Sequence, residues 1–273
     1  MNCINKYIKY STVVTLLILP VSCPSLAQSF PEFEIEQTQK QLGFSLPEIP
    51  PGLGSPQGRG GGGASRGGCS NDLDLPPMTA LIPEGSLELT INEYPTIWVY
   101  IPYASEEISD GTFSLQSPGG DEFWAVTFEL PDRPGIVGVE FPSQFEPLLL
   151  NETYIWNFAV SCNNNDSSNE KEDDVFGFIQ RVELSQLNNY PSEEVNLGQT
   201  LLDDATAYAF YGVWYDALDA LARLRLTSTE TDANHEQINR DWFDLLTDNK
   251  VSLDGIAESE VIEFVTITNS PRE

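Results

Sequence analysis

Hydrophobic residues recur at every second position between Leu73 and about Leu184, which is the spacing of half-buried β-strands. Turn signals rich in Pro and Gly separate the runs. The clearest runs are Leu87–Ile91, Ile97–Ile101, Trp124–Leu130, Val137–Phe141 and Tyr154–Cys162. About seven short strands of this kind predict an antiparallel β-sandwich over residues 73–188.

One segment of the predicted sandwich adds detail to its fold class. LLLNETYIWNF at 148–158 resembles the tyrosine corner of immunoglobulin-like and fibronectin type III domains. In that motif a Tyr hydroxyl forms a hydrogen bond back to the chain a few residues upstream. We therefore expect an immunoglobulin/fibronectin-like sandwich.

From about Leu201 the hydrophobic spacing changes to 3.6 residues, which predicts helices over residues 198–258 and leaves 259–273 as a C-terminal tail. The run AYAFYGVWYDALDALARL at 207–224 looks like a tetratricopeptide-type helical hairpin with Gly212 at its turn. Arrays of such units need about three repeats for stability, and one is visible. We expect this hairpin to pack against the sandwich or against a partner.

The first 27 residues have the pattern of a secretory signal peptide. Lys6 and Lys9 precede the apolar run Val13–Leu19, and Ser25-Leu26-Ala27 places small residues before a cleavage site. The apolar run is shorter than the roughly 20 residues of a membrane-spanning helix, so we expect no transmembrane segment after cleavage. Residues 28–72, rich in Pro, Gly, Ser and Gln, are predicted to form a disordered linker.

The charge of the chain limits its partners. The sequence has 13 basic and 42 acidic residues and a net charge of −29, and cleavage after Ala27 leaves 11 basic and 42 acidic residues, or −31. Such a field repels nucleic acid and anionic membrane surfaces. Together with the signal peptide it indicates a periplasmic or secreted protein.

Cleavage would also remove Cys3 and Cys23 and leave Cys69 and Cys162. In an oxidising compartment two cysteines most simply form one disulfide, although free thiols and intermolecular bonds are the alternatives. Cys162 shares a strand face with Trp156 and Phe158, so its side chain is expected to point inward. A bond to Cys69 would attach the end of the linker to the sandwich.

Several short motifs suggest chemistry that their surroundings do not support. GRGGGGASRGGC at 58–69 contains GxGxxG and two RGG triplets, but neither a strand nor a helix flanks it, and the chain is acidic. SxxK at 168–171 lies in a polar loop. His235, the one histidine, lies in HEQIN without a second imidazole and is expected to be exposed near a helix start. GASRG at 63–67 matches GxSxG, but it lies in the same glycine-rich stretch, without the strand and helix of a nucleophile elbow. We therefore predict no enzymatic activity, no cofactor and no metal centre.

Two groups of residues remain as binding hypotheses. Tyr100 and Tyr103 are expected to be partly exposed and are the first choice for a contact surface. The loop at 163–174 could supply calcium with oxygen ligands, although it lacks EF-hand spacing and a solvated acidic loop is the default interpretation. Its acidic residues are Asp166, Glu170, Glu172, Asp173 and Asp174.

A series of motifs, taken in order along the chain, resembles an exported cyanobacterial family, domain of unknown function 928, over about residues 58–250. The motifs are GRGGGGASRGGC, TALIPE, EYPTIWVYIPY, RPGIVGVEFP, YIWNFAVSC, FIQRVEL and YGVWYDALDALARLR. The resemblance implies no activity and no catalytic residues. It implies that the sandwich and the hairpin form one unit and that Cys69 and Cys162 belong to the family pattern.

These observations favour a non-enzymatic protein-interaction or adaptor module of the periplasm or cell envelope, with another protein of that compartment as its partner. A carbohydrate- or calcium-binding envelope module is the alternative, and a carboxylate-based hydrolase ranks third. The oligomeric state stays open.

Overall fold

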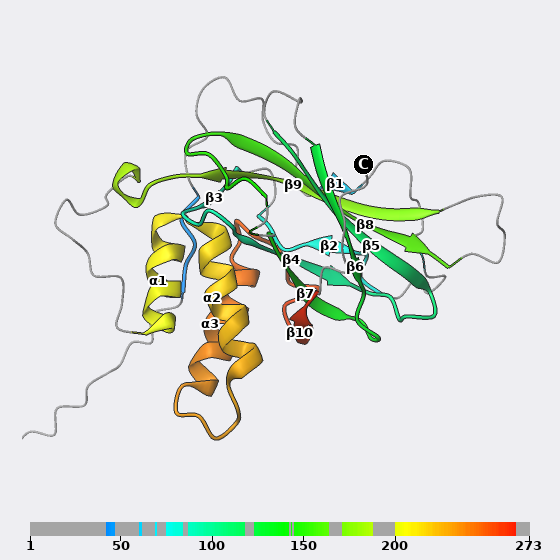
Figure 1. Ribbon diagram of the computed structural model, residues 1–273. Coiled ribbons are helices and arrows are strands. Elements are labelled where there is room, and N and C mark those ends of the chain that lie inside the picture. The colour runs from blue at the N-terminus through cyan, green and yellow to red at the C-terminus, as the bar shows by residue number, and fades with distance from the viewer. Residues whose placement is uncertain are drawn as a thin grey trace, which may run out of the picture. The chain divides into compact units, whose positions relative to one another are not determined.

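The computed structural model describes residues 42–46, 60–61, 69, 75–83, 87–117, 123–141, 143, 145–163, 171–187 and 200–265 (Figure 1). The chain divides into two compact units, Met1–Gln39 and Lys40–Glu273, and every described residue belongs to the second. The predicted signal peptide at 1–27 lies outside the described residues. Within them, no helix has the length and hydropathy that crossing a membrane requires.

The strands form two sheets. The larger sheet has six strands and runs in the order β1 (Gly60–Gly61), β9 (Glu172–Arg181), β8 (Thr153–Cys162), β5 (Ile108–Gln116) and β6 (Phe123–Glu129), with β3 (Glu88–Thr90) also paired to β9. The smaller sheet runs in the order β10 (Val261–Phe264), β7 (Gly135–Glu140), β4 (Thr96–Ile101) and β2 (Thr79–Ala80).

Both sheets are mixed, because β3 pairs with β9 and β10 pairs with β7 in parallel. The prediction of a purely antiparallel sandwich is wrong for these two pairs, and an immunoglobulin-like topology is not confirmed. The predicted tyrosine-corner contact is present, since the Tyr154 hydroxyl accepts the Leu149 N–H at 3.2 Å. Alternating hydrophobicity thus identified strands but not their directions.

Aromatic side chains fill the space between the sheets and beneath the helices. Phe113 of the larger sheet contacts Phe141, which follows β7, with ring centroids 5.1 Å apart. All residues of β4 are buried, so this strand is covered on both faces. The Trp side chains that the structure describes are all buried, namely Trp98, Trp156, Trp214 and Trp242, whereas the side chain of Trp124 lies outside the described residues.

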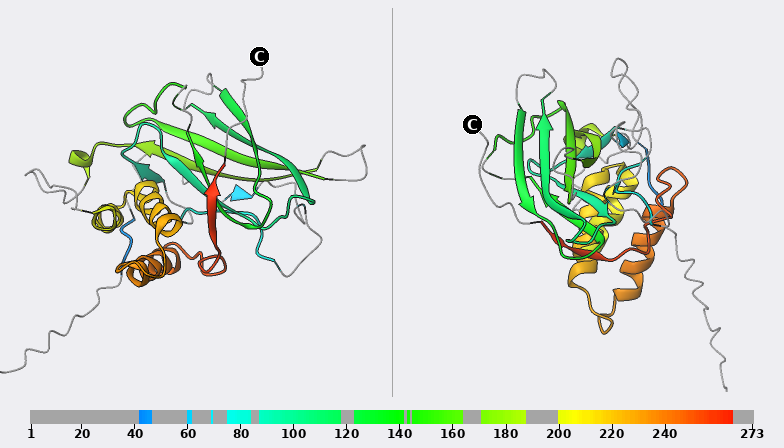
Figure 2. Two further views of the ribbon diagram at one scale, coloured as in Figure 1. Left: turned by 60° about the horizontal axis from the view of Figure 1, so that its bottom comes forward. Right: turned by 90° about the vertical axis from the view of Figure 1, so that its right-hand side faces the viewer.

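Three helices, α1 (Leu201–Tyr211), α2 (Trp214–Thr227) and α3 (His235–Thr247), follow the short 3₁₀ helix η1 (Leu184–Gln186). They lie side by side on one side of the sheets (Figure 2). Thr200 caps α1 by accepting the Asp203 N–H, and Gly212 ends it with φ +77°, a left-handed conformation that glycine adopts without steric cost. The helical hairpin is present, but a tetratricopeptide repeat is not confirmed.

Two segments differ from the sequence prediction. Leu42 and Phe44, assigned to the disordered linker 28–72, lie in the core, and the Ser45 N–H donates to the Ala209 carbonyl. Residues 261–264, assigned to the tail 259–273, form β10. Both segments contact elements that are distant in sequence. Their local hydrophobic pattern therefore does not predict that they belong to the fold.

Replacing Phe44 tests whether this early segment is part of the folded core. Its ring is 2% exposed and packs edge-to-face on Trp214, with centroids 4.9 Å apart. We expect Phe44→Ala to lower the free energy of unfolding by about 3 kcal/mol in urea denaturation, because it leaves a cavity. Leu46→Ala, at a position 43% exposed, is the control and should cost less than about 0.5 kcal/mol. Equal, small effects of both variants would contradict the packing.

Candidate functional site

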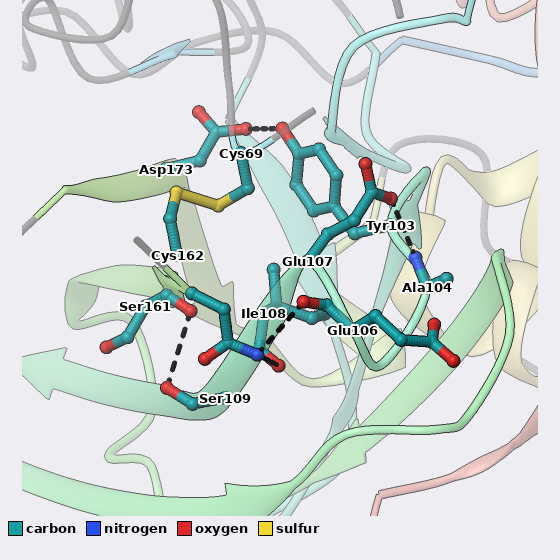
Figure 3. Close-up of a disulfide and its surroundings, with 11 residues drawn as sticks. Cys69, Tyr103, Ala104, Glu106, Glu107, Ile108, Ser109, Ser161, Cys162 and Asp173 are labelled. Atoms are coloured by element: carbon teal, nitrogen blue, oxygen red, sulfur yellow. Dashed lines mark hydrogen bonds between the residues drawn. A yellow bond between two sulfur atoms is a disulfide. The ribbon is translucent and has the colours of Figure 1, made fainter. Parts of the chain in front are cut away.

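A disulfide joins Cys69 to Cys162, the last residue of β8 (Figure 3). The two Cα atoms are 5.0 Å apart and the cysteines are separated by 93 residues in sequence. The bond attaches the end of the glycine-rich stretch to the larger sheet, as the sequence predicted. Gly60 and Gly61 of that stretch pair with Phe176 and Val175 on β9, so part of it is an edge strand.

The turn beside the disulfide is held by side-chain hydrogen bonds. Asn163, directly after Cys162, donates its amide to the Ile108 carbonyl at 2.7 Å. A Glu107 carboxylate oxygen accepts the Ala104 N–H at 3.1 Å (Figure 3). These bonds fix the start of β5 against the end of β8.

Tyr103 occupies the buried side of the same region. Its hydroxyl donates to Asp173 on β9 (Figure 3). Burial raises the pKa of Tyr103, and the bond to Asp173 raises it further, so the phenol stays protonated as a donor. Burial also raises the pKa of Asp173, while the bond from Tyr103 lowers it. The pair links the chain after β4 to β9 beside the disulfide.

The predicted exposure of Tyr100 and Tyr103 is wrong. Their side chains are 6% and 3% exposed, because β4 is covered on both faces and Tyr103 turns toward Asp173. These two residues therefore belong to the core.

The acidic loop is only partly described. Asp166 and Glu170 lie outside the described residues, so the calcium hypothesis for this loop is not tested. Of the remaining three, Glu172 is exposed at the start of β9, and Asp173 is bonded to Tyr103. Asp174 accepts the Asn157 amide at 2.9 Å. Among the described residues no group of three or more His, Cys, Asp or Glu side chains is arranged to hold a metal ion.

Two carboxylates of α2 that the sequence analysis did not single out lie against the sheets. Asp216 is 4% exposed and accepts the Ile91 N–H at 3.2 Å and the Asn92 amide at 2.7 Å. Burial raises its pKa to about 7, against the lowering effect of hydrogen bonds from Thr90 and from the Ile91 N–H. From the helical pattern alone, an Asp at this position would be expected to face solvent. Only the tertiary contacts show that it is buried.

Asp219, one turn further along α2, accepts the Trp98 indole N–H at 3.2 Å and the Arg223 Nε–H at 2.8 Å. Burial raises its pKa and the bonds from Arg223 lower it. Arg223 also pairs with Glu140 of β7 at 2.6 Å. Both carboxylates serve to join α2 to the sheets.

The face of the larger sheet turned away from the smaller one is the candidate interaction surface. On β8 the residues that alternate with the buried Trp156, Phe158 and Val160 point to this outer face. The strand register places them in rows across β9, β8, β5 and β6. The central rows are Phe178–Ile155–Gln116, Phe176–Asn157–Ser114–Ala125 and Asp174–Ala159–Thr112–Thr127.

The outer face has a single carboxylate in its central rows and is apolar at one end. Within these rows, as far as the structure describes them, Asp174 is the one ionisable side chain, and it is bonded to Asn157. Ile155 is 40% exposed, and its neighbour Phe178 packs on a small cluster of Leu87, Leu89 and Val182. The opposite end is acidic, since Asp110 pairs with Glu129, and Glu172 lies beside Ser161.

The sequence analysis recognised the strands of this face but not the face itself. In the alternating pattern of each strand, the Ser, Thr, Asn and Gln residues of this face look like ordinary solvent-exposed positions. The small number of charged residues on this face becomes visible only after four strands are aligned by their register. His235, expected to be exposed, is partly buried at the first residue of α3.

The family model described as Domain of Unknown Function (DUF928) matches residues 61–261 of the chain. This range includes both sheets except Gly60 and the end of β10, together with all three helices. No curated protein and no solved structure matches the chain.

The disulfide predicts a measurable contribution to stability. Closing a loop of 93 residues should stabilise the folded chain by about 4 kcal/mol through the entropy of the unfolded state. The double variant Cys69→Ser/Cys162→Ser should lose this amount in urea denaturation and should not respond to reductant. Two alkylatable thiols in the purified wild-type protein, measured by mass spectrometry without reductant, would refute the bond.

The raised pKa of Asp216 predicts that the stability of the fold depends on pH. Its pKa in the folded chain is about 7, above the ordinary 3.8, so the folded state binds this proton more tightly than the unfolded state. Asp216 therefore destabilises the fold as pH rises between these values. From about pH 5 to about pH 8, the stability of Asp216→Asn relative to wild type should rise on the order of 2 kcal/mol.

Urea denaturation across this pH range measures the effect. Asp232→Asn is the control, because bonds from Thr229 lower the pKa of Asp232 and its titration falls below this range. An Asp216→Asn variant whose stability relative to wild type is independent of pH would contradict the assignment.

Proposed function

We propose that this chain, which belongs to the DUF928 family, is an exported module that binds another protein through the outer face of its larger sheet. Export is supported by the signal-peptide pattern of residues 1–27 and by the disulfide, which persists in oxidising compartments. The partner is then a protein of the periplasm or cell envelope.

The proposal rests on the contrast between the strongly negative chain and the few charged residues on its outer face. The chain has a net charge of −29, yet the central rows of the outer face contain one carboxylate, already bonded to Asn157. Interface centres are depleted in charged residues relative to the remaining surface. An area with so few charges on so acidic a chain therefore favours contact with a partner over contact with water.

The shape of the face favours a protein over a small ligand. Ser114, Ala125 and Ala159 have short side chains, so the centre of the face is flat and allows close approach of a second backbone. Ile155 and Phe178 supply an apolar end that a partner side chain can cover. The carboxylates of Asp110, Glu129 and Glu172 at the other end favour basic residues at the matching edge of the partner.

Site-specific photocrosslinking tests this proposal in the cells that produce the protein. A photoreactive residue at Ser114 should form an adduct with a second protein, whereas one at Phe243 on α3, which is 44% exposed, should not. Ile155→Arg should reduce the Ser114 adduct about tenfold or more, because it places a charge in the apolar end. The matched control Phe243→Arg should leave the adduct unchanged.

Two results would contradict the proposal. One is a Ser114 adduct that persists unchanged in Ile155→Arg. The other is binding of the purified chain to a glycan panel that Ile155→Arg abolishes, which would support the carbohydrate-binding alternative.

A further inference from the structure

A pocket of about 400 Å³ lies where the last turn of α2, the start of α3 and β10 meet. Its polar lining consists of Arg225, His235, Asn239 and Glu260. Its apolar wall consists of Leu226, Val261 and Ile262. This volume lies within the range of sites for small organic ligands, and the lining combines several polar groups with an apolar wall.

Arg225 is the unusual member of the pocket. Its guanidinium lies over the Trp242 ring, 4.9 Å from the centroid, and burial lowers its pKa. Arginine nevertheless stays charged in proteins. The other arginines that the structure describes, Arg133, Arg181, Arg223 and Arg240, each have a carboxylate within 4 Å. No ion pair or hydrogen bond joins Arg225 to any described residue.

The nearby carboxylate of Glu260 attracts Arg225 electrostatically, but its ion pair is formed with Arg133. Glu260 forms a two-point ion pair with Arg133, and the hydrogen bond from Arg133 lowers the pKa of Glu260. The positive charge of Arg225 is therefore available to a ligand. The proximity of Glu260 and the acidic chain favour an anion of single charge over one of double charge.

His235 and Asn239 supply further hydrogen-bonding groups next to this charge. They are four residues apart on α3, with the Asn239 amide 3.0 Å from His235 Nε2. The second ring nitrogen of His235 lies 3.3 Å from the Ser228 hydroxyl. These contacts orient the ring and the amide at the wall of the pocket.

We propose that this pocket binds a small organic monocarboxylate. Its carboxylate would pair with the planar fork of the Arg225 guanidinium, which matches carboxylate geometry. Its apolar part lies against Leu226, Val261 and Ile262. This site involves none of the residues of the outer face. The test of ligand binding here is therefore independent of the test of the proposed protein partner.

Isothermal titration calorimetry on the full exported chain tests the proposal with isobutyrate and benzoate as probes. Their neutral amides, isobutyramide and benzamide, have nearly the same shape. We expect the carboxylates to bind with a dissociation constant on the order of 1 mM, and the amides at least about tenfold more weakly. Equal binding of acid and amide, binding of inorganic phosphate in their place, or no carboxylate binding at about 10 mM would overturn the proposal.

Two variants assign the binding to the pocket. Arg225→Gln should weaken carboxylate binding about tenfold or more, while Arg240→Gln, which removes an arginine paired with Glu236 on α3, should not. Asn239→Asp leaves the Arg225–Trp242 contact in place and adds a negative charge, so it should weaken binding to a similar extent. Unchanged affinity in Arg225→Gln or in Asn239→Asp would overturn the assignment.

Discussion

The hydroxyl group of Tyr215 lies between the larger sheet and α2 and makes two buried hydrogen bonds. It accepts the Trp156 indole N–H at 2.8 Å and donates to the Phe178 carbonyl at 2.9 Å. One residue earlier, the Trp214 indole donates to the Leu81 carbonyl at 2.8 Å. Burial raises the pKa of Tyr215 and keeps its proton in place as a donor. Because unpaired polar groups are costly in a core, α2 can be buried only in the register that satisfies all three bonds.

This register of α2 determines where the rest of the structure lies. Asp216 and Asp219 follow on the same helix and bind the segment after β3 and the Trp98 side chain of β4. The bond to the Phe178 carbonyl holds β9 from its inner side, and the Phe178 side chain then belongs to the outer face. At the other end of α2, the same register brings Arg225 next to Trp242 and β10. Both proposed binding sites thus depend on one buried helix.

Local sequence patterns predicted most of the strands, the helical region, the Tyr154 contact and the disulfide, because each depends on spacing or on residue chemistry. The parallel pairing of β3, the strand β10 and the buried segment around Phe44 could not be predicted in this way. Each is defined by a partner more than 80 residues away, such as Trp214 for Phe44 and Ile179 for Glu88. The outer face and the pocket likewise could not be predicted from local sequence. One requires the register of four strands, and the other brings together residues from two helices and a strand.

Charge distinguishes the two sites from the remaining surface. A chain with 42 acidic residues gains solubility from exposed carboxylates, and folding alone gives no reason to omit them from the middle of an open sheet. Folding also gives no reason to leave the half-buried guanidinium of Arg225 without an ion pair when acids are abundant, since desolvating a charge costs free energy unless it is paired. Each feature is explained if a second molecule binds there: a partner protein on the outer face, and an anion in the pocket.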